Sequence, residues 1–262
     1  GVADIWNLVD VQQLNLSIYC MIWTIYFIIL IYFTLGFTGF YIINRKKKRD
    51  EARNSWVKFI TYFFIIHILF FSILFFPVVF RILTLIIITG GFYELYKIFR
   101  ESGYRKPVFF LSSLFILGLF SVGFYFFSGL NSRLVLFTFL ILSIFDSFSQ
   151  IAGQLWGRRK LFRKISPQKT VEGLIGGIIV AVASSWLLKD IIKGTEFYPM
   201  RLATGIVAFA FLGDMITSFY KRAYNVKDFS NLIPGHGGFL DRFDSLIAGG
   251  AFVALCELFG RI

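Results

Sequence analysis

Long apolar runs recur along the chain, with short polar stretches between them. A helix needs about 20 mostly apolar residues to cross the hydrocarbon core of a bilayer. The pattern therefore predicts eight membrane helices, at residues 18–43, 59–80, 82–99, 107–129, 134–156, 172–188, 201–220 and 245–261. The first apolar run is too long for a cleavable signal and has no basic region before it. We expect an all-α, polytopic integral membrane protein with about eight transmembrane helices.

The composition agrees with this pattern. Hydrophobic residues make up 57% of the 262 positions, aromatic residues 20% and charged residues only 16%. Soluble domains are rarely so apolar. No internal repeat or soluble domain is visible, so we expect a single membrane domain over residues 1–262, in a bacterial inner membrane. Cys20 and Cys256 fall in or beside apolar segments, which favours neither a disulfide framework nor a zinc site.

The basic residues alternate between the two sides of the predicted helices. The loops at 44–58, 97–106, 158–170 and 221–242 carry 21 of the 27 Lys and Arg residues. The positive-inside rule puts these loops in the cytoplasm and both termini outside. The net charge of +12 then reflects topology, anionic lipid headgroups or a polyanionic substrate, and we expect no nucleic-acid partner.

The polar stretch at residues 218–244 lies between two apolar runs and holds the sequence P-G-H-G-G. Its ionisable residues are Lys221, Arg222, Lys227, Asp228, His236, Asp241, Arg242 and Asp244. Just upstream, Asp214 lies within an apolar run, where an ionisable residue is costly and indicates a functional site. Such groups are tolerated at membrane depth when they line a water-filled cavity, so we expect a polar cavity that faces the cytoplasm.

A second informative stretch covers residues 146–173. Asp146 is another acid within an apolar run, and Gly153 and Gly157 are spaced for close helix packing. Ser166 followed by Pro167 resembles a helix cap and first turn, so we expect a helix N-terminus beside Lys169 and Thr170. A helix N-terminus among basic residues favours an anion. A capped helix behind a basic membrane-surface loop explains this stretch equally well.

One more acid lies in an apolar helix, near its cytoplasmic end. Glu94 comes three residues before Lys97, the spacing at which two side chains on one helix face could form an ion pair.

Together, these residues suggest a class of chemistry. Oxygen ligands without Cys or clustered His suit hard cations, Mg²⁺ above all, which commonly bridges to substrate phosphates. The basic residues are numerous enough to hold a triphosphate, and glycines let the backbone approach a ligand closely. Acids for a metal and bases for phosphates at a membrane surface favour phosphoryl or nucleotidyl transfer to a lipid. A structural ion-pair cluster between helices is the alternative.

The stretch from Ser218 to Asp244 closely resembles the signature of the phosphatidate cytidylyltransferases (CDP-diacylglycerol synthases). The blocks that begin at Asp146 and at Ser166 resemble that family's other hallmarks, except that Phe148 and Gln150 replace a small and an aromatic residue. The resemblance covers roughly residues 81–262, whereas residues 18–80 carry no diagnostic motif. It implies an enzyme that joins CTP and phosphatidate to give CDP-diacylglycerol and pyrophosphate, using Mg²⁺.

The resemblance also implies roles for individual residues. It gives a metal centre formed by Asp214, Asp241 and Asp244, with Lys221 as a further catalytic residue. It gives the following residues to the binding of CTP and phosphate: Asp146, Ser166, Lys169, Thr170, Glu172, Arg222, His236, Gly237, Gly238 and Arg242. A second monovalent or divalent cation and a homodimer are compatible with the sequence.

Two alternatives stay open. One is a related CTP-dependent enzyme that acts on another lipid phosphate or on a lipid alcohol. The other is a non-catalytic membrane scaffold or transporter, although a transporter needs no basic loop beside a metal-type acid cluster.

Overall fold

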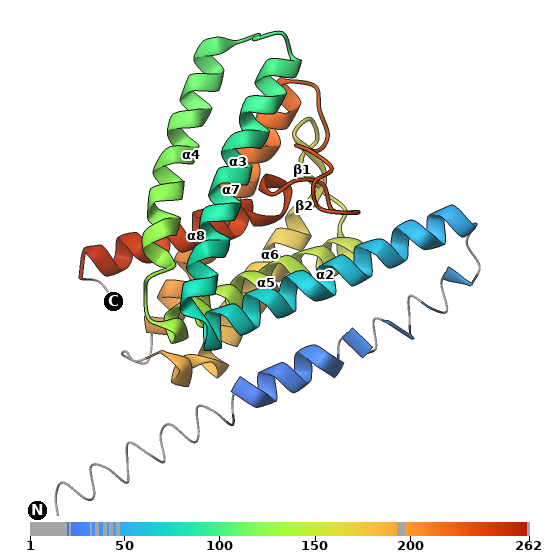
Figure 1. The fold of residues 1–262 in the computed structure, drawn as a ribbon. Coiled ribbons are helices and arrows are strands. Elements are labelled where there is room, and N and C mark those ends of the chain that lie inside the picture. The colour runs from blue at the N-terminus through green and yellow to red at the C-terminus, as the bar shows by residue number, and fades with distance from the viewer. Residues whose placement is uncertain are drawn as a thin grey trace, which may run out of the picture. The chain divides into compact units, whose positions relative to one another are not determined.

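The computed structural model describes residues 20, 22–31, 33–34, 37–38, 41, 44–45, 48–192 and 198–260 (Figure 1). The chain divides into two compact units, residues 1–64 and 65–262. The prediction of a single membrane domain therefore stays a prediction.

The first unit holds a short apolar helix at Ile22–Ile31 and the beginning of helix α2 (Arg49–Phe75). Much of the predicted helix at 18–43 lies outside the described residues, as do residues 1–17, Lys46 and Lys47.

The second unit is helical. After the end of α2 come α3 (Pro77–Glu101), α4 (Pro107–Phe127), α5 (Ser132–Trp156), α6 (Val171–Leu187), α7 (Tyr198–Ala223) and α8 (Leu240–Leu258). Within the described part of the chain, five segments are long and apolar enough to cross a membrane: Trp56–Phe75, α3, α4, α5 and α7. The protein is thus an all-α polytopic membrane protein, and the number of eight spans stays a prediction.

Most predicted helices agree with the structure to within a few residues, but three boundaries differ. Helix α2 begins at Arg49 instead of residue 59. The break predicted near residue 81 lies at Phe76, because Pro77 starts α3. Proline lacks the N–H that a helix interior needs, and its ring suits the first helical turn. Helix α8 begins at Leu240 instead of residue 245, which brings Asp241 and Asp244 into its first turns.

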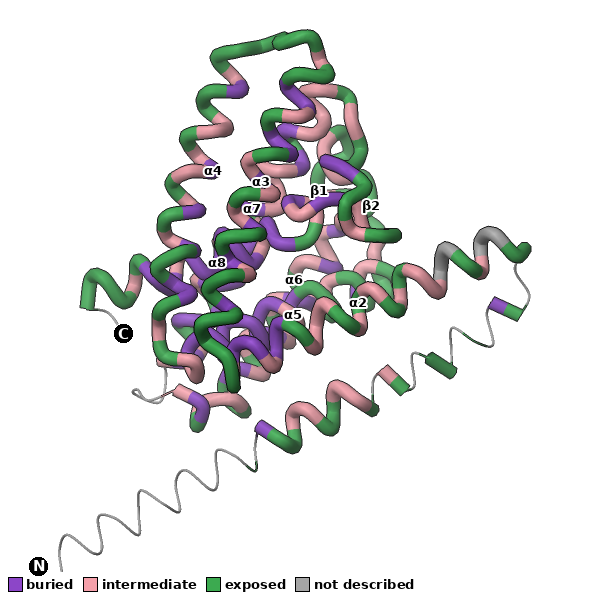
Figure 2. Tube along the Cα trace, viewed as in Figure 1, coloured by how far each residue is buried: buried purple, intermediate pink, exposed green. Residues whose placement is uncertain are grey.

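The most extensive contacts in the second unit join α5 with α6 and α7 with α8, and α4 also packs along α8. Small residues permit this closeness. A Cβ atom on Gly213 of α7 would lie 2.6 Å from the Ala248 Cβ of α8, and one on Gly123 of α4 would lie 2.7 Å from the Ala251 Cβ. Figure 2 shows that α8 and the first half of α5 are largely buried, so these two helices form much of the core.

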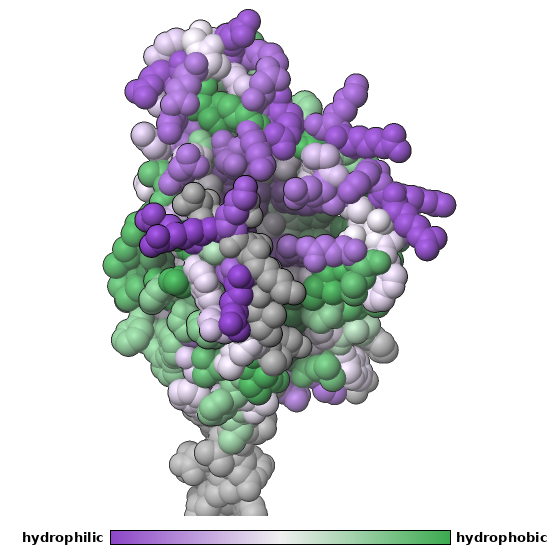
Figure 3. Space-filling model, turned by 90° about the vertical axis from the view of Figure 1, so that its right-hand side faces the viewer, coloured by the Kyte–Doolittle hydropathy of each residue, from purple (hydrophilic) through white to green (hydrophobic). Residues whose placement is uncertain are grey.

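A short antiparallel hairpin interrupts the helices, which the sequence pattern did not predict. It pairs β1 (Lys160–Phe162) with β2 (Ser166–Thr170), and the chain enters α6 directly from β2. The hairpin carries exposed basic residues, and the Arg222 Nε of α7 donates a hydrogen bond to the Ile165 carbonyl in its turn, at 3.1 Å. Figure 3 shows hydrophilic side chains gathered at one end of the face in view, with hydrophobic surface below them.

Candidate active site

Four ionisable residues from three helices and the hairpin come together, and we call them the Lys169 cluster: Asp146 of α5, Lys169 of β2, Asp214 of α7 and Asp244 of α8. Lys169 forms an ion pair with Asp214. Asp244 and Asp146 act on Lys169 electrostatically, and Asp244 also acts on Asp146. Three predicted acids therefore surround one predicted phosphate-binding lysine.

The position of Lys169 follows from local backbone structure. It is the fourth residue of β2, and the next residue, Thr170, caps α6 by accepting a hydrogen bond from the Gly173 N–H at 3.1 Å. The predicted cap at Ser166 and Pro167 is therefore wrong, because these two residues are in the strand. A threonine hydroxyl supplies the acceptor that the first turn of a helix lacks.

The glycines of α5 make room for this turn. A Cβ atom on Gly157 would lie 2.7 Å from the Thr170 Cγ2, and one on Gly153 would lie 3.1 Å from its Oγ1. The prediction that Gly153 and Gly157 permit close packing is confirmed. Both glycines pack against Thr170, which ends β2, directly follows Lys169 and caps α6.

Lys169 is only partly accessible, with 34% of its side chain exposed. Burial lowers the pKa of its ammonium, whereas the nearby carboxylates of Asp244 and Asp146 oppose that change. The ammonium also lies 5.4 Å from the centre of the Phe211 ring of α7. One cation thus balances several acids in a confined space.

Asp244 is buried where α7 and α8 cross. Its Oδ2 accepts a hydrogen bond of 2.6 Å from the Thr217 hydroxyl, and its Oδ1 accepts one of 2.7 Å from the Ser245 N–H. A Cβ atom on Gly213 would lie 2.8 Å from the Asp244 carbonyl oxygen, so the crossing depends on glycine. The same crossing brings Asp214, the next residue along α7, to the cluster.

A second group of residues holds the P-G-H-G-G loop, and we call it the loop clamp: Lys221, Phe229, Gly238 and Asp241. The Asp241 Oδ1 accepts from the Lys221 ammonium at 2.6 Å. Its Oδ2 accepts from the Phe229 N–H at 2.8 Å and from the Gly238 N–H at 2.9 Å. Only 6% of the Asp241 side chain is exposed, so its oxygens serve the loop.

This arrangement bears on the predicted metal centre of Asp214, Asp241 and Asp244, which stays a prediction. Among the described residues, no group of three or more His, Cys, Asp or Glu side chains could hold a metal ion. Asp241 does not join Asp214 and Asp244, because three internal donors already engage its two oxygens. Asp214 forms an ion pair with Lys169 and Asp244 acts on the same lysine electrostatically, so these two predicted ligands share one partner.

Some of the other predicted binding residues make hydrogen bonds within the protein, and others lie at more accessible positions. Arg222 donates to the carbonyls of Ile165 and Val226, and so joins the hairpin to the end of α7. Glu172 accepts from the N–H groups of Arg158 and Arg159 at 3.1 to 3.2 Å, which orders the chain before β1. These contacts favour architectural roles for Arg222 and Glu172.

His236 and Arg242 lie at the outer side of the loop. The Arg242 Nε donates to the His236 carbonyl at 3.3 Å, and Arg242 acts electrostatically on Asp146. Gly237 has a φ of +88°, which a side chain rarely permits, and a Cβ atom there would lie 2.8 Å from an Asp241 oxygen. Arg242 thus extends the positive charge toward the Lys169 cluster.

Two polar residues with contacts near the site, Thr217 and Ser230, were not predicted, and Glu94 was predicted with a different partner. The predicted ion pair between Glu94 and Lys97 is wrong, because Lys97 pairs with Glu101 at 3.9 Å. Glu94 is buried instead, and accepts a hydrogen bond of 2.5 Å from the Ser230 hydroxyl. The position of Glu94 within an apolar run could have indicated this, since a buried acid requires a hydrogen-bonding partner.

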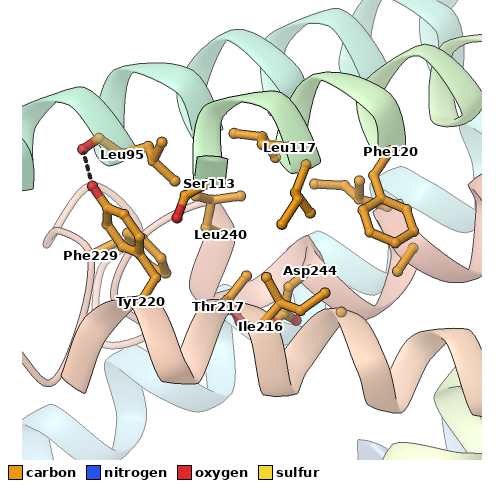
Figure 4. A pocket seen from close by; sticks show the side chains of 14 residues that line it. Leu95, Ser113, Leu117, Phe120, Ile216, Thr217, Tyr220, Phe229, Leu240 and Asp244 are labelled. Atoms are coloured by element: carbon orange, nitrogen blue, oxygen red, sulfur yellow. Dashed lines mark hydrogen bonds between the residues drawn. The ribbon is translucent and has the colours of Figure 1, made fainter. Parts of the chain in front are cut away.

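A largely apolar cavity lies between α3, α4, α7 and α8 and reaches Asp244 (Figure 4). In Figure 4, Leu117 and Phe120 face Ile216 across it, with Thr217 and Asp244 on the α7 and α8 side. One acid of the Lys169 cluster, Asp244, therefore lies at the wall of an apolar cavity.

Comparison with known sequences decides the family. The sequence model of the cytidylyltransferase family matches residues 126–259, just over half of the chain. The chain belongs to the cytidylyltransferase family. The match covers the end of α4, the hairpin and all of α5 to α8, and therefore both the Lys169 cluster and the loop clamp. Residues of α3, including Glu94, lie outside it.

Similar curated proteins are phosphatidate cytidylyltransferases. The chain is 38% identical over 131 residues to that of Staphylococcus epidermidis, covering 48% of this chain and 50% of the relative. It is 40% identical over 134 residues to that of Haemophilus influenzae, covering 48% and 46%. The Bacillus subtilis protein is 41% identical over 104 residues, covering 39% of each. This family member thus spans about half or less of the length of these relatives.

Proposed function

We propose that the protein transfers the cytidylyl group of CTP to phosphatidate, releasing pyrophosphate and leaving CDP-diacylglycerol in the membrane. The observation that carries this proposal is the position of the Lys169 cluster at the edge of an apolar cavity. A charged site that can bind a nucleotide thus adjoins an apolar pocket between helices that the lipid can contact. The names of the similar proteins support the same substrates.

Lys169 is the residue best suited to the CTP phosphates. Among the described residues it forms an ion pair with Asp214, so a triphosphate can exchange with or bridge this pair. Arg242 and the exposed basic residues of the hairpin add positive charge nearby. Charge-assisted contacts from Lys and Arg stabilise both the triphosphate and the pyrophosphate that leaves.

Asp214 and Asp244 are the residues that we propose to hold Mg²⁺. When bound, the ion would neutralise phosphate charge and orient the triphosphate. Thr217 holds the Asp244 carboxylate in one orientation through its hydrogen bond, and Ser218 contributes a longer one of 3.3 Å to Asp214. These two hydroxyls keep both acids directed toward the crossing of α7 and α8.

The lipid would approach from the apolar cavity. Its walls are mainly apolar side chains of four helices, and its polar edge includes Thr217 and Asp244. The cavity measures only about 40 Å³, so an acyl chain would lie along the outside of these apolar helices, with the phosphatidate headgroup next to the Lys169 cluster. Proximity of two bound reactants supplies a large share of the rate in such transfers.

The chemistry needs no covalent enzyme intermediate. A phosphate oxygen of phosphatidate attacks the α-phosphorus of CTP, and a new P–O bond forms. The bond between the α-phosphorus and the bridging oxygen breaks, and pyrophosphate leaves with that electron pair. The nucleophile is already an anion, so the main task of the protein residues is to bring two anions together in line.

We further propose that this site faces the cytoplasm of a bacterial inner membrane. The excess of Lys and Arg in the loops on that side supports this orientation. A cysteine introduced at the exposed Asn231 should react with an impermeant reagent only from the cytoplasmic side. Reaction from the outside alone would overturn the orientation.

The direct test is pyrophosphate release by the purified protein with CTP and Mg²⁺, with and without phosphatidate in mixed micelles. We expect release that depends on phosphatidate, together with a CDP-lipid in the mass spectrum. Release with another lipid phosphate or a lipid alcohol, but not with phosphatidate, would change the acceptor. No release with any of these lipids would contradict the proposed function.

A further inference from the structure

Glu94 is a carboxylate on α3 that lies outside the region matched by the family model. It is fully buried, with 0% of its surface exposed. Three donors point at its two oxygens. The Oε1 accepts from the Ser230 hydroxyl at 2.5 Å and from the Phe239 N–H at 2.8 Å, and the Oε2 accepts from the Leu240 N–H at 2.9 Å.

Ser230 precedes the P-G-H-G-G loop, and the two N–H donors, Phe239 and Leu240, lie at the start of α8. The first N–H groups of a helix have no partner within the helix, and Phe239, at the N-cap position, has no acceptor in its side chain. Glu94 therefore supplies, from a different helix, the acceptors that a capping residue would provide. A carboxylate also interacts favourably with the positive end of the helix dipole.

The neighbouring backbone is shaped to receive this contact. A Cβ atom on Gly90 would lie 2.6 Å from the Phe239 ring, and one on Gly91 would lie 2.9 Å from the Leu240 side chain. Gly238 approaches Glu94 so closely that a Cβ atom there would lie 2.6 Å from Oε2. Two glycines on α3 and one in the loop thus fit the start of α8 against Glu94.

The consequence reaches the proposed site. Asp241 and Asp244 lie in the first turns of α8, and Asp241 also holds the Gly238 N–H. Glu94 of α3 and Asp241 of α8 therefore both accept hydrogen bonds from the backbone of the same turn, residues 238–240. Displacement of that turn would move Asp244 relative to Lys169 and Asp214.

We propose that Glu94 is a positioning residue, which sets the start of α8 and thereby the geometry of Asp244 in the Lys169 cluster. This inference rests on the proposed function for its kinetic consequence, but its structural part does not. Glu94 touches none of the residues in the Lys169 cluster directly in the contacts described, so its effect acts through the loop and α8.

The test compares Glu94→Gln with Glu94→Asp, and uses Glu101→Gln as the matched control. Glu101 lies on the same helix, its side chain is 56% exposed, and it meets only Lys97 among the described ion pairs. The Gln side chain replaces one acceptor oxygen with a donor, so at least one N–H of the helix start loses its acceptor. The Asp side chain keeps both acceptors but is shorter by one methylene group.

For phosphatidate-dependent pyrophosphate release, we expect Glu94→Gln to lower kcat by about 10-fold to 100-fold. The KM for phosphatidate should stay within about twofold of wild type, because the Glu94 side chain does not itself line the apolar cavity. Glu94→Asp should recover part of kcat, and Glu101→Gln should match wild type. A Glu94→Gln enzyme with wild-type kcat, or one altered only in KM, would contradict the proposal.

A second readout needs no turnover. Amide hydrogen exchange in purified Glu94→Gln should be faster than in wild type at residues 238–241, while exchange in the first half of α5 stays unchanged. Unchanged exchange at the start of α8 would overturn the proposal even if activity fell. Global loosening with lost α5 protection would show a folding role instead and would also count against it.

The two readouts separate the two proposals. If the wild-type protein releases no pyrophosphate with any lipid, the proposed function fails, and the exchange experiment still decides whether Glu94 holds the turn. If wild type is active and neither kcat nor exchange responds to Glu94→Gln, only the role of Glu94 fails.

Discussion

The Lys169 cluster and the loop clamp use the same kinds of side chain in different ways. In the loop clamp, Asp241 receives a lysine and two backbone N–H groups, and its side chain is 6% exposed. In the Lys169 cluster, Asp214 shares one lysine with two other acids and is 24% exposed. A carboxylate saturated by internal donors builds structure, whereas one with spare acceptors near solvent can bind a ligand.

The difference has an energetic basis. Burial of a charge is unfavourable unless hydrogen bonds and an opposite charge compensate it, which the loop clamp achieves within the protein. The Lys169 cluster holds three acids against one lysine, so bound cations would relieve its repulsion. An incompletely balanced cluster is therefore the better candidate for substrate and metal binding.

The largest expected effect comes from Asp214→Asn, which tests the ligand-binding side of the comparison. Loss of this charge should lower kcat by at least about 100-fold, because it removes a group proposed to hold Mg²⁺ and to balance Lys169. The variant should still purify from the membrane fraction in wild-type yield. Pyrophosphate release measures the effect, and near-normal turnover would remove Asp214 from the site.

Lys169→Ala tests which substrate the cluster recognises. Removal of the ammonium should raise the KM for CTP by about 10-fold or more, the effect of one lost charge-assisted contact. The KM for phosphatidate should change little. The measurement is initial rate against each substrate in turn, and the reverse pattern would assign Lys169 to the lipid headgroup.

Thr217→Val gives the smallest effect and sharpens the role of Asp244. The substitution conserves volume but removes the hydroxyl that donates to the Asp244 Oδ2. We expect a fall in kcat of about 5-fold to 10-fold, in line with one hydrogen bond to a charged group. Thr204→Val, at an exposed position of the same helix, serves as control. Equal rates in both variants would show that Asp244 needs no fixed orientation.

Much of the fold could be predicted from the sequence because apolar runs and proline positions are local signals. The runs located α3 to α8, and only the boundaries at Pro77 and Leu240 were misjudged. The β1–β2 hairpin was missed because it is short and its residues are basic. Strand pairing there depends on contacts across a turn, which hydropathy does not register.

The sequence identified most residues of the candidate site, but it did not predict which of them contact one another. Sequence motifs singled out Asp146, Lys169, Asp214 and Asp244, and the structure brings these four together. The resemblance to the family gave Asp241 to the metal, which stays a prediction. Spacing along a helix describes only near neighbours, and it paired Glu94 with Lys97, which in the structure pairs with Glu101. In the structure, Asp241 holds the P-G-H-G-G loop. Glu94 contacts residues far away in the sequence, such as Ser230, which is 136 residues distant.

The central claim is that Asp214 binds ligand while Asp241 holds the fold, and thermal melting of the purified variants tests it most directly. Without nucleotide, Asp214→Asn should melt near wild type, and Asp241→Asn should be destabilised by about 3 kcal/mol, as expected for a broken buried ion pair. With CTP and Mg²⁺, wild type and Asp241→Asn should gain stability, whereas Asp214→Asn should gain little. A large loss of stability in Asp214→Asn alone, or a wild-type response of that variant to CTP, would contradict the account.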